Sequence, residues 1–216
     1  MIVEKALTDV GGLYTQNLRE HGLTSKSVGW KDEASQLLRF AKLGLLIERD
    51  SKNTNQGITV NDLGCGYGAM FKYLDNLPGF RLDRYFGYDI SSTMLEAAAE
   101  HIKDPRAELI NGTNLTRMAD YSFVSGTFNV RMDASDEVWT EYIKSMIANL
   151  AAHSSKGFAF NLLSTYVDWK QGNLYYGDPL FFFDYCKRNV SRYVTLVHDY
   201  PLYEWTMIVR MGGETK

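Results

Sequence analysis

The chain has few of the residues that organise several common classes of protein. Its 216 residues include only two cysteines, far apart in sequence, and four histidines, and neither type shows the spacing of metal ligands. A disulfide framework is therefore excluded, and we expect no metal site and a reducing, cytoplasmic setting. No stretch approaches the ~20 apolar residues of a membrane span. The first residues carry an acid early and lack a long apolar core, so we expect no secretory signal either.

An excess of positive charge is missing too. The net charge is -3 and the pI is about 5.8, whereas a nucleic-acid-binding face is normally basic. We therefore expect no nucleic-acid partner. With 45% hydrophobic residues the chain can bury one substantial core, and nothing in it demands a second, so we predict a single domain over residues 1–216.

The stretch from Ile58 to Ala69 carries the most informative local pattern. An apolar, strand-like run stops at the acid Asp62 and passes into glycines, after which apolar residues recur at helical spacing. Glycines at 64, 66 and 68 permit positive φ and let a ligand touch the backbone. A strand-to-helix turn of this kind, at the carboxyl end of a parallel strand, is where doubly wound sheets bind nucleotides.

A second acid ends the next predicted strand. Asp89 follows Gly64 by 25 residues, slightly beyond the ~20 residues expected between a nucleotide-binding loop and the carboxylate that takes ribose hydroxyls. A carboxylate suits this task because it can accept from both hydroxyls at once. Two acids at the ends of consecutive strands therefore predict a site for a nucleoside.

The glycines alone do not choose the cofactor. Gly64-x-Gly66-x-x-Ala69 also satisfies the dinucleotide fingerprint, and a glycine-rich turn without any ligand is the third option. Asp62 favours a different cofactor, because its carboxylate is a poor neighbour for a pyrophosphate and a good one for an ammonium group.

Two segments resemble the class I S-adenosylmethionine-dependent methyltransferases. They are Asp62-x-Gly64-x-Gly66-x-Gly68 and Gly87-Tyr-Asp-Ile-Ser-x-x-Met-Leu-x-x-Ala, and the resemblance as a whole covers about residue 55 to the end. It implies S-adenosylmethionine as cofactor and S-adenosylhomocysteine as product. After the third strand the chain lacks the family's usual acid beside the adenine, and Thr113 or Asn114 could accept from the adenine amino group instead. The resemblance places these residues at the cofactor: Asp62, Gly64, Cys65, Gly66, Gly68, Asp89, Ile90, Met94, Thr113, Asn114, Ser125 and Gly126, with Arg39 as a carboxylate clamp.

The fold that we predict is a three-layer, doubly wound α/β structure. Its mostly parallel seven-stranded sheet would end in a C-terminal antiparallel hairpin, because residues 193–199 and 204–210 alternate as strands across a short link. Residues 55–216 would form this Rossmann-like core and residues 1–50 an N-terminal helical lid. Within the lid we expect one helix interrupted or ended near Gly11-Gly12 and His21-Gly22, and a second over about 32–48 that places Leu37, Ala41 and Leu45 on one face.

The sequence defines the binding site of the methyl acceptor less well than that of the cofactor. The lid and the loop 165–179 are the only long additions to the fold, and they carry aromatic and polar residues suited to a polar ring. In the family, the rim at residues 125–131 borders the transferred methyl group. We expect substrate contacts from Trp30, Asn129, Arg131 and Tyr175.

Methyl transfer from a sulfonium requires alignment and exclusion of water but no covalent intermediate. A hydroxyl or ammonium nucleophile must lose a proton, and the topology offers His198, Asp168 and Tyr166 as candidate bases. His198 could instead be a satisfied histidine of the hairpin, and Asp168 could only cap a turn.

These features favour an enzyme that methylates an O or N nucleophile of a small polar molecule, such as a sugar or a natural-product intermediate. Two alternatives stay open: a nicotinamide-dependent oxidoreductase, and a non-catalytic protein that binds the cofactor and serves a partner. A monomer and a homodimer are both compatible with the sequence.

Overall fold

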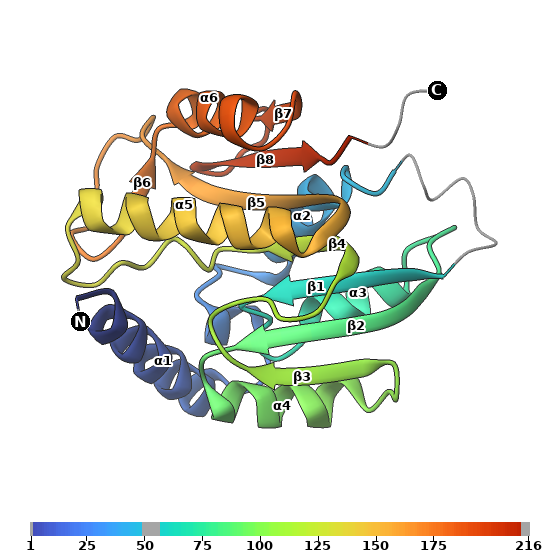
Figure 1. Ribbon diagram of the computed structural model, residues 1–216. Helices are drawn as coiled ribbons and strands as arrows, with labels where there is room; N and C mark the ends of the chain where they lie inside the picture. The colour runs from blue at the N-terminus through green and yellow to red at the C-terminus, as the bar shows by residue number, and fades with distance from the viewer. Residues whose placement is uncertain (1, 49–56, 213–216) are drawn as a thin grey trace.

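A single mixed sheet organises the residues that the computed structural model describes, which are 2–48 and 57–212 (Figure 1). Its strand order is β3-β2-β1-β4-β5-β8-β7. The strands are β1 (Ile58–Leu63), β2 (Leu82–Asp89), β3 (Ala107–Asn111), β4 (Ala119–Val124), β5 (Ser154–Ser164), β7 (Tyr193–Val197) and β8 (Glu204–Arg210), and the two-residue β6 (Tyr176–Gly177) pairs with the end of β5. The neighbours from β3 to β5 run parallel, whereas β8 is antiparallel to β5 and β7 to β8. The predicted sheet and its closing hairpin are confirmed.

Helices cover both faces of this sheet. They are α1 (Ile2–His21), the 3-10 turn η1 (Ser25–Val28), α2 (Glu33–Gly44), α3 (Ala69–Asp75), α4 (Ser92–Ile102), α5 (Asp136–Ala152) and α6 (Pro179–Asn189). One core lies between the sheet and α2, α3 and α4, and the other between the sheet and α5 and α6. Helix α1 lies at the carboxyl ends of β2 and β3, beside their arrowheads in Figure 1, and contacts α4 and α5.

The two cores explain why the central strands are apolar almost without a break. On β5, Phe158 and Phe160 pack into the core under α5 and α6, while Ala159 between them packs into the opposite core. On β8, Met207 packs into the core under α5 and α6, and Ile208 packs into the opposite core. Successive side chains of a strand point to opposite faces, so a strand buried on both faces needs apolar residues at nearly every position.

Two local predictions were wrong, and each has a physical reason. Helix α1 is not interrupted at Gly11-Gly12, because the residues on both sides keep its apolar stripe in register, and it ends as predicted at His21, where Gly22 has φ +62°. Helix α2 buries Gln36, Arg39, Phe40, Leu43 and Gly44, and leaves Leu37 45% exposed.

No helix within residues 2–48 and 57–212 is long and apolar enough to cross a membrane.

Candidate active site

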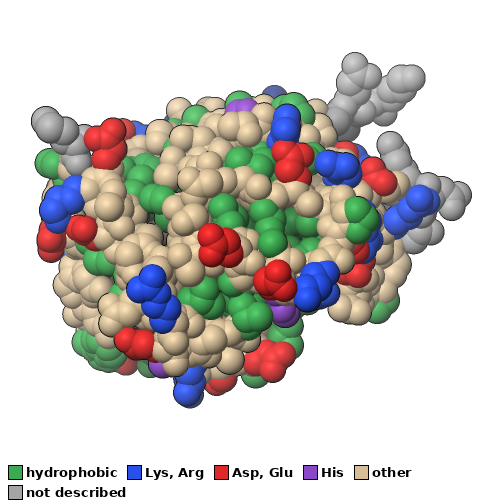
Figure 2. All heavy atoms as spheres, turned by 90° about the horizontal axis from the view of Figure 1, so that it is seen from below, with side chains coloured by type: hydrophobic (Ala, Val, Ile, Leu, Met, Phe, Trp, Pro, Cys, Tyr) green, Lys and Arg blue, Asp and Glu red, His purple; other side chains and the backbone are tan. Residues whose placement is uncertain are grey.

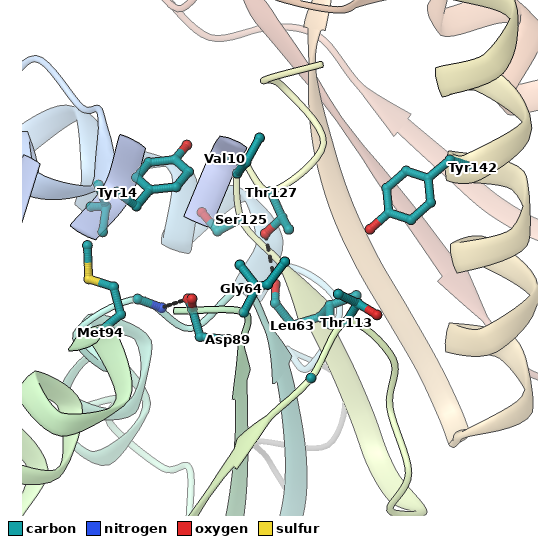
Figure 3. A pocket seen from close by; sticks show the side chains of 15 residues that line it. Val10, Tyr14, Leu63, Gly64, Asp89, Met94, Thr113, Ser125, Thr127 and Tyr142 are labelled. Carbon is teal, nitrogen blue, oxygen red and sulfur yellow. Dashed lines mark hydrogen bonds between the residues drawn. The ribbon is translucent and has the colours of Figure 1, made fainter. Parts of the chain in front are cut away.

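A cavity opens at the carboxyl ends of β1, β2 and β4, under α1 (Figure 3). It encloses about 640 Å³ when the part open to solvent is counted. Its walls are Val10, Tyr14, Val28, Leu63, Gly64, Gly66, Asp89, Ile90, Met94, Gly112, Thr113, Ser125, Gly126, Thr127 and Tyr142.

The turn after β1 needs glycine for two reasons. Gly64 has φ +78°, and a Cβ added there would lie 2.1 Å from Oγ1 of Thr127. Thr127 is fixed in turn, because its hydroxyl donates to the carbonyl of Leu63 at 2.9 Å. The turn after β1 and the turn after β4 therefore touch, and any side chain at Gly64 would force them apart.

The backbone N–H groups of this turn are already used within the protein. Those of Gly64 and Cys65 both donate to the carbonyl oxygen of Tyr88, at 2.8 and 2.9 Å, and that of Gly66 donates to Oδ2 of Asp89 at 2.9 Å. The turn thus ties the end of β1 to the end of β2. A loop that cradles a pyrophosphate presents its N–H groups to the ligand, so this arrangement counts against a dinucleotide.

Asp89 lies on the floor of the cavity with hydrogen-bonding capacity to spare (Figure 3). Its Oδ1 accepts from the N–H of Ser91 and its Oδ2 from that of Gly66, both at 2.9 Å. Burial raises the pKa of Asp89, and these backbone donors oppose the rise. Each carboxylate oxygen accepts more than one hydrogen bond, so Asp89 can still take two ligand hydroxyls.

Asp62 lines a smaller side chamber, of about 310 Å³ when the part open to solvent is counted. The chamber shares the walls Val28, Gly64 and Ser125 with the main cavity, and Trp30, Gln36 and Tyr67 also line it. Asp62 is 2% exposed and accepts from the hydroxyl of Tyr85 at 2.5 Å. Burial raises the pKa of Asp62 to about 7.

Helix α1 roofs the main cavity with Val10 and Tyr14. It is docked by a 2.8 Å hydrogen bond between the hydroxyls of Thr15 and Ser91. Tyr142 of α5 lies on the opposite side of the cavity from Tyr14 (Figure 3). Burial raises the pKa of both tyrosines to about 12, and Asp89 contributes to the rise at Tyr14.

These groups match one kind of cofactor. Asp89 with the apolar Ile90 and Met94 suits a nucleoside, and the buried carboxyl of Asp62 beyond Gly64 suits an ammonium group. The described residues hold no cluster of His, Cys, Asp and Glu that could bind a metal ion. S-adenosylmethionine has a nucleoside at one end and an amino acid at the other, and therefore fits.

Comparison with known proteins identifies the family. A family model described as "Methyltransferase domain" matches residues 60–157. The chain is also 45% identical over 164 residues to a Mycobacterium tuberculosis (strain ATCC 25618 / H37Rv) protein named "Putative methyltransferase Rv1506c", covering 74% of this chain and 98% of that protein. The chain belongs to the class I S-adenosylmethionine-dependent methyltransferases.

Two solved structures share the fold of this methyltransferase. Magnesium protoporphyrin IX methyltransferase from Synechocystis PCC 6803, with bound S-adenosylhomocysteine, matches with a TM-score of 0.64 at 11% identity, over 98% of each chain. A SAM-dependent methyltransferase of Leishmania major matches with a TM-score of 0.62 at 14% identity, over 93% of this chain and 82% of that one.

Most residues expected at the cofactor do line the two spaces. Asn114 and Gly68 do not: Asn114 is exposed and donates from its amide to the hydroxyl of Thr113 at 3.2 Å, and Gly68 caps α3 with φ +83°. The main cavity takes Gly64, Gly66, Asp89, Ile90, Met94, Thr113, Ser125 and Gly126, and the side chamber takes Asp62 and Cys65. Burial raises the pKa of the Cys65 thiol well above its ordinary value, so this cysteine is no reactive thiolate.

Arg39 forms a buried ion pair instead of facing the cavity. Its Nε lies 2.8 and 2.9 Å from the two carboxylate oxygens of Glu204, and the two side chains are 9% and 0% exposed. The guanidinium also stacks on the ring of Trp30 at 3.7 Å. That ring covers Gly126, where a Cβ would lie 2.2 Å from it, so Trp30 forms a wall of the side chamber.

The other expected substrate residues are held by the protein itself. Oδ1 of Asn129 accepts from the N–H of Leu163 at 3.1 Å. Arg131 pairs with Asp136 at 2.9 Å, and the hydroxyl of Tyr175 bonds that of Thr140 at 2.7 Å. Among the described residues, those that line the main cavity and the side chamber do not include Asn129, Arg131 or Tyr175.

The three candidate bases lie outside these walls as well. His198, Asp168 and Tyr166 are all exposed, and the rings of His198 and Tyr166 contact each other with centroids 5.9 Å apart.

The sequence analysis did not predict several residues that line the site, chiefly Val10, Tyr14, Gln36 and Tyr142. Val10, Tyr14 and Tyr142 belong to apolar helical stripes that favour core packing. Gln36 stands in the pattern Ser35-Gln36-x-x-Arg39-Phe40, which resembles the leading segment of some small class I methyltransferases but assigns it no role. The apolar stripe of α1 was a usable signal, because a helix ahead of the first strand must cover some surface, and here it covers the cofactor cavity.

Proposed function

We propose that this methyltransferase transfers the methyl group to an O or N nucleophile of a small polar molecule, such as a sugar or a natural-product intermediate, with residues 1–50 acting as a lid. The observation that carries the proposal is the roof over the cavity. Helix α1 is anchored by the Thr15–Ser91 hydrogen bond and by its packing against α4, which leaves a roofed cavity rather than a broad groove. A cavity covered by a helix suits a small acceptor better than a segment of protein or nucleic acid.

The charge of the surface supports an acceptor other than nucleic acid. On the face drawn in Figure 2, acidic and basic side chains alternate among the described residues, and no continuous basic area stands out. The net charge of -3 points the same way.

The walls of the cavity support catalysis mainly by alignment. Asp89 is the one carboxylate among the described residues that line the main cavity, and it is engaged by Gly66 and Ser91. Tyr14 and Tyr142, each with a pKa raised to about 12, stay protonated near neutral pH and are weak bases there. We therefore favour a nucleophile that needs no base from the protein, such as a neutral amine or a carboxylate carried by the sugar or natural-product intermediate. The bound cofactor supplies the electrophilic methyl group, and the protein holds the two in line and excludes water.

A panel of acceptors tests the proposal. Amines, carboxylic acids, sugars, a protein mixture and RNA would each be incubated with methyl-labelled S-adenosylmethionine. We expect turnover on a small amine or acid, with a pH profile of kcat that follows the acceptor's own pKa. Label in protein or RNA alone would contradict the proposal, as would a complex with S-adenosylhomocysteine in which α1 lies away from an open groove.

A further inference from the structure

The side chamber contains more polar groups than a packed core would leave there. Asp62, Gln36, Tyr67 and Ser125 all line a space beside the glycine turn, of about 310 Å³ when the part open to solvent is counted. Ser125 borders both this chamber and the main cavity, so a ligand held by Asp89 reaches the chamber by passing over Gly64. The amino-acid end of the cofactor is the part that extends in this direction once its nucleoside is at Asp89.

The carboxylate of that amino acid needs hydrogen-bond donors, and the usual sources are already committed. The N–H groups of Gly64, Cys65 and Gly66 are bonded to Tyr88 and Asp89, as described above. Arg39 is tied through its Nε to Glu204, in a pair whose side chains are 9% and 0% exposed, and it is not among the described residues that line the chamber. Releasing Arg39 would leave the carboxylate of Glu204 buried without its partner, which is strongly unfavourable.

Gln36 and Ser125 are two wall residues of the chamber that can still donate a hydrogen bond. Gln36 is 5% exposed, and its Oε1 accepts from the hydroxyl of Tyr67 at 3.0 Å, which fixes the amide. Its Nε2 has no hydrogen-bond partner within residues 2–48 and 57–212, and Gln36 lines both the side chamber and an outer cavity beside Tyr73 and His101. The hydroxyl of Ser125 is a buried group that likewise lacks a partner in the described part of the chain. A buried donor without a partner costs free energy until a ligand supplies one.

We propose that the amide of Gln36 and the hydroxyl of Ser125 bind the carboxylate of the cofactor's amino-acid end, in place of an arginine clamp. Asp62 then takes the ammonium group on the other side of the chamber. The chain thus recognises this end of the cofactor through one buried acid and two neutral donors. The inference concerns the cofactor alone and does not depend on which acceptor is methylated.

Calorimetric titration separates the contributions to binding. S-adenosylhomocysteine carries the carboxylate and the ammonium, its decarboxylated analogue keeps only the ammonium, and 5′-methylthioadenosine carries neither. The informative variant is Gln36→Glu, because glutamate still accepts from Tyr67 but offers no donor and brings a negative charge. Ser125→Ala is the second variant, and Gln171→Glu, an exposed position outside both spaces, is the matched control.

We expect Gln36→Glu to weaken binding of S-adenosylhomocysteine about 10- to 100-fold, as loss of a hydrogen bond to a charged group implies. Binding of 5′-methylthioadenosine and of the decarboxylated analogue should not weaken. Ser125→Ala should show the same selectivity with a smaller loss, and Gln171→Glu should change nothing.

The ratio of affinities within one variant does not depend on how much of the protein is folded. Equal losses for all three ligands in Gln36→Glu and Ser125→Ala would overturn the proposal, and so would unchanged binding of S-adenosylhomocysteine. A selective loss in Arg39→Gln with none in Gln36→Glu would assign the carboxylate to the arginine instead.

Discussion

Asp62 and Asp89 are both buried acids at strand ends, yet their surroundings differ. Asp89 accepts two backbone N–H groups, which favour its charged form. Asp62 has one hydroxyl donor, from Tyr85, and burial raises its pKa to about 7. In the apoprotein, ionising the buried carboxyl of Asp62 therefore costs free energy, and an ammonium ligand would reduce that cost.

This cost predicts a specific dependence of stability on pH. The folded pKa of Asp62, about 7, lies above the unfolded value of 3.8, so the folded state holds a proton that the unfolded state releases. The free energy of unfolding should fall as pH rises from about 4 to 7, by on the order of 4 kcal/mol at most, and stay lowered above that range. Asp62→Asn keeps an acceptor for Tyr85 and should be more stable than the parent at pH 8 but not at pH 4.

Urea unfolding of the apoprotein at both pH values measures this difference. Asp83→Asn, at an exposed position on the same strand as Asp89, is the control and should follow the parent at both pH values. Equal free energies of unfolding for Asp62→Asn and the parent at pH 8 would refute the argument.

Among single residues, those with a local motif were predictable. Asp62, Gly64 and Asp89 stand at fixed spacings around a strand-to-helix turn, and backbone geometry demands glycine at position 64. Gln36 could not be found in this way. Its place in the side chamber depends on how α2 packs against the turn, a long-range contact without a local signature.

At the scale of elements, α2 and β8 are joined across the chain by the buried Arg39–Glu204 pair. Glu204 also accepts from the amide of Asn161, whose Oδ1 accepts from the N–H of Gly126 at 2.7 Å. One network thus connects the lid segment, the sheet and the turn after β4. Apolar periodicity assigned the wrong face to α2 because its buried face contains these polar partners.

A double-mutant cycle tests this connection. Glu204→Gln keeps an acceptor for Asn161 but leaves the guanidinium of Arg39 buried without its counter-charge, so we expect a loss of about 3–5 kcal/mol in the free energy of unfolding. Adding Arg39→Met removes the unpaired charge and should recover part of the loss. Denaturant melts of the parent, the two single variants and the double variant measure the coupling. Strictly additive effects would mean that the pair does not couple α2 to β8.

Helix α1 offers a second test at this scale, through its adjacent glycines. A Cβ at Gly12 would meet nothing within 4 Å, whereas one at Gly11 would lie 3.4 Å from Ile90. Gly12→Ala should therefore stabilise the protein by about 0.5–1 kcal/mol, since glycine is unfavourable in a helix interior. Gly11→Ala should gain less, because its methyl group must fit against Ile90. Thermal melts compare them, and an equal gain for both would contradict the docking of α1 on Ile90.

The whole molecule consists of a sheet whose strand ends form the cofactor site and of helix α1, which covers that site. The sequence predicted the sheet better than the position of α1. The parallel strands, the closing hairpin and the acids at the strand ends follow from local patterns, because alternation and strand length are encoded in neighbouring residues. Tyr14 and Tyr142 line the same cavity, from opposite sides, only because α1 packs across the strand ends and contacts α5. That packing depends on the whole fold, and so do the exposed positions of His198, Asp168 and Tyr166.

The central claim is that the carboxyl ends of β1 and β2 bind S-adenosylmethionine through Asp89, and isothermal titration with S-adenosylhomocysteine tests it most directly. We expect saturable binding by the parent protein, weakened at least about 10- to 100-fold in Asp89→Ala, which removes a charged acceptor of the ribose hydroxyls. Asp83→Ala, outside the walls of the cavity, should bind like the parent. No binding of either S-adenosylhomocysteine or S-adenosylmethionine, or binding that Asp89→Ala leaves unchanged, would contradict the account.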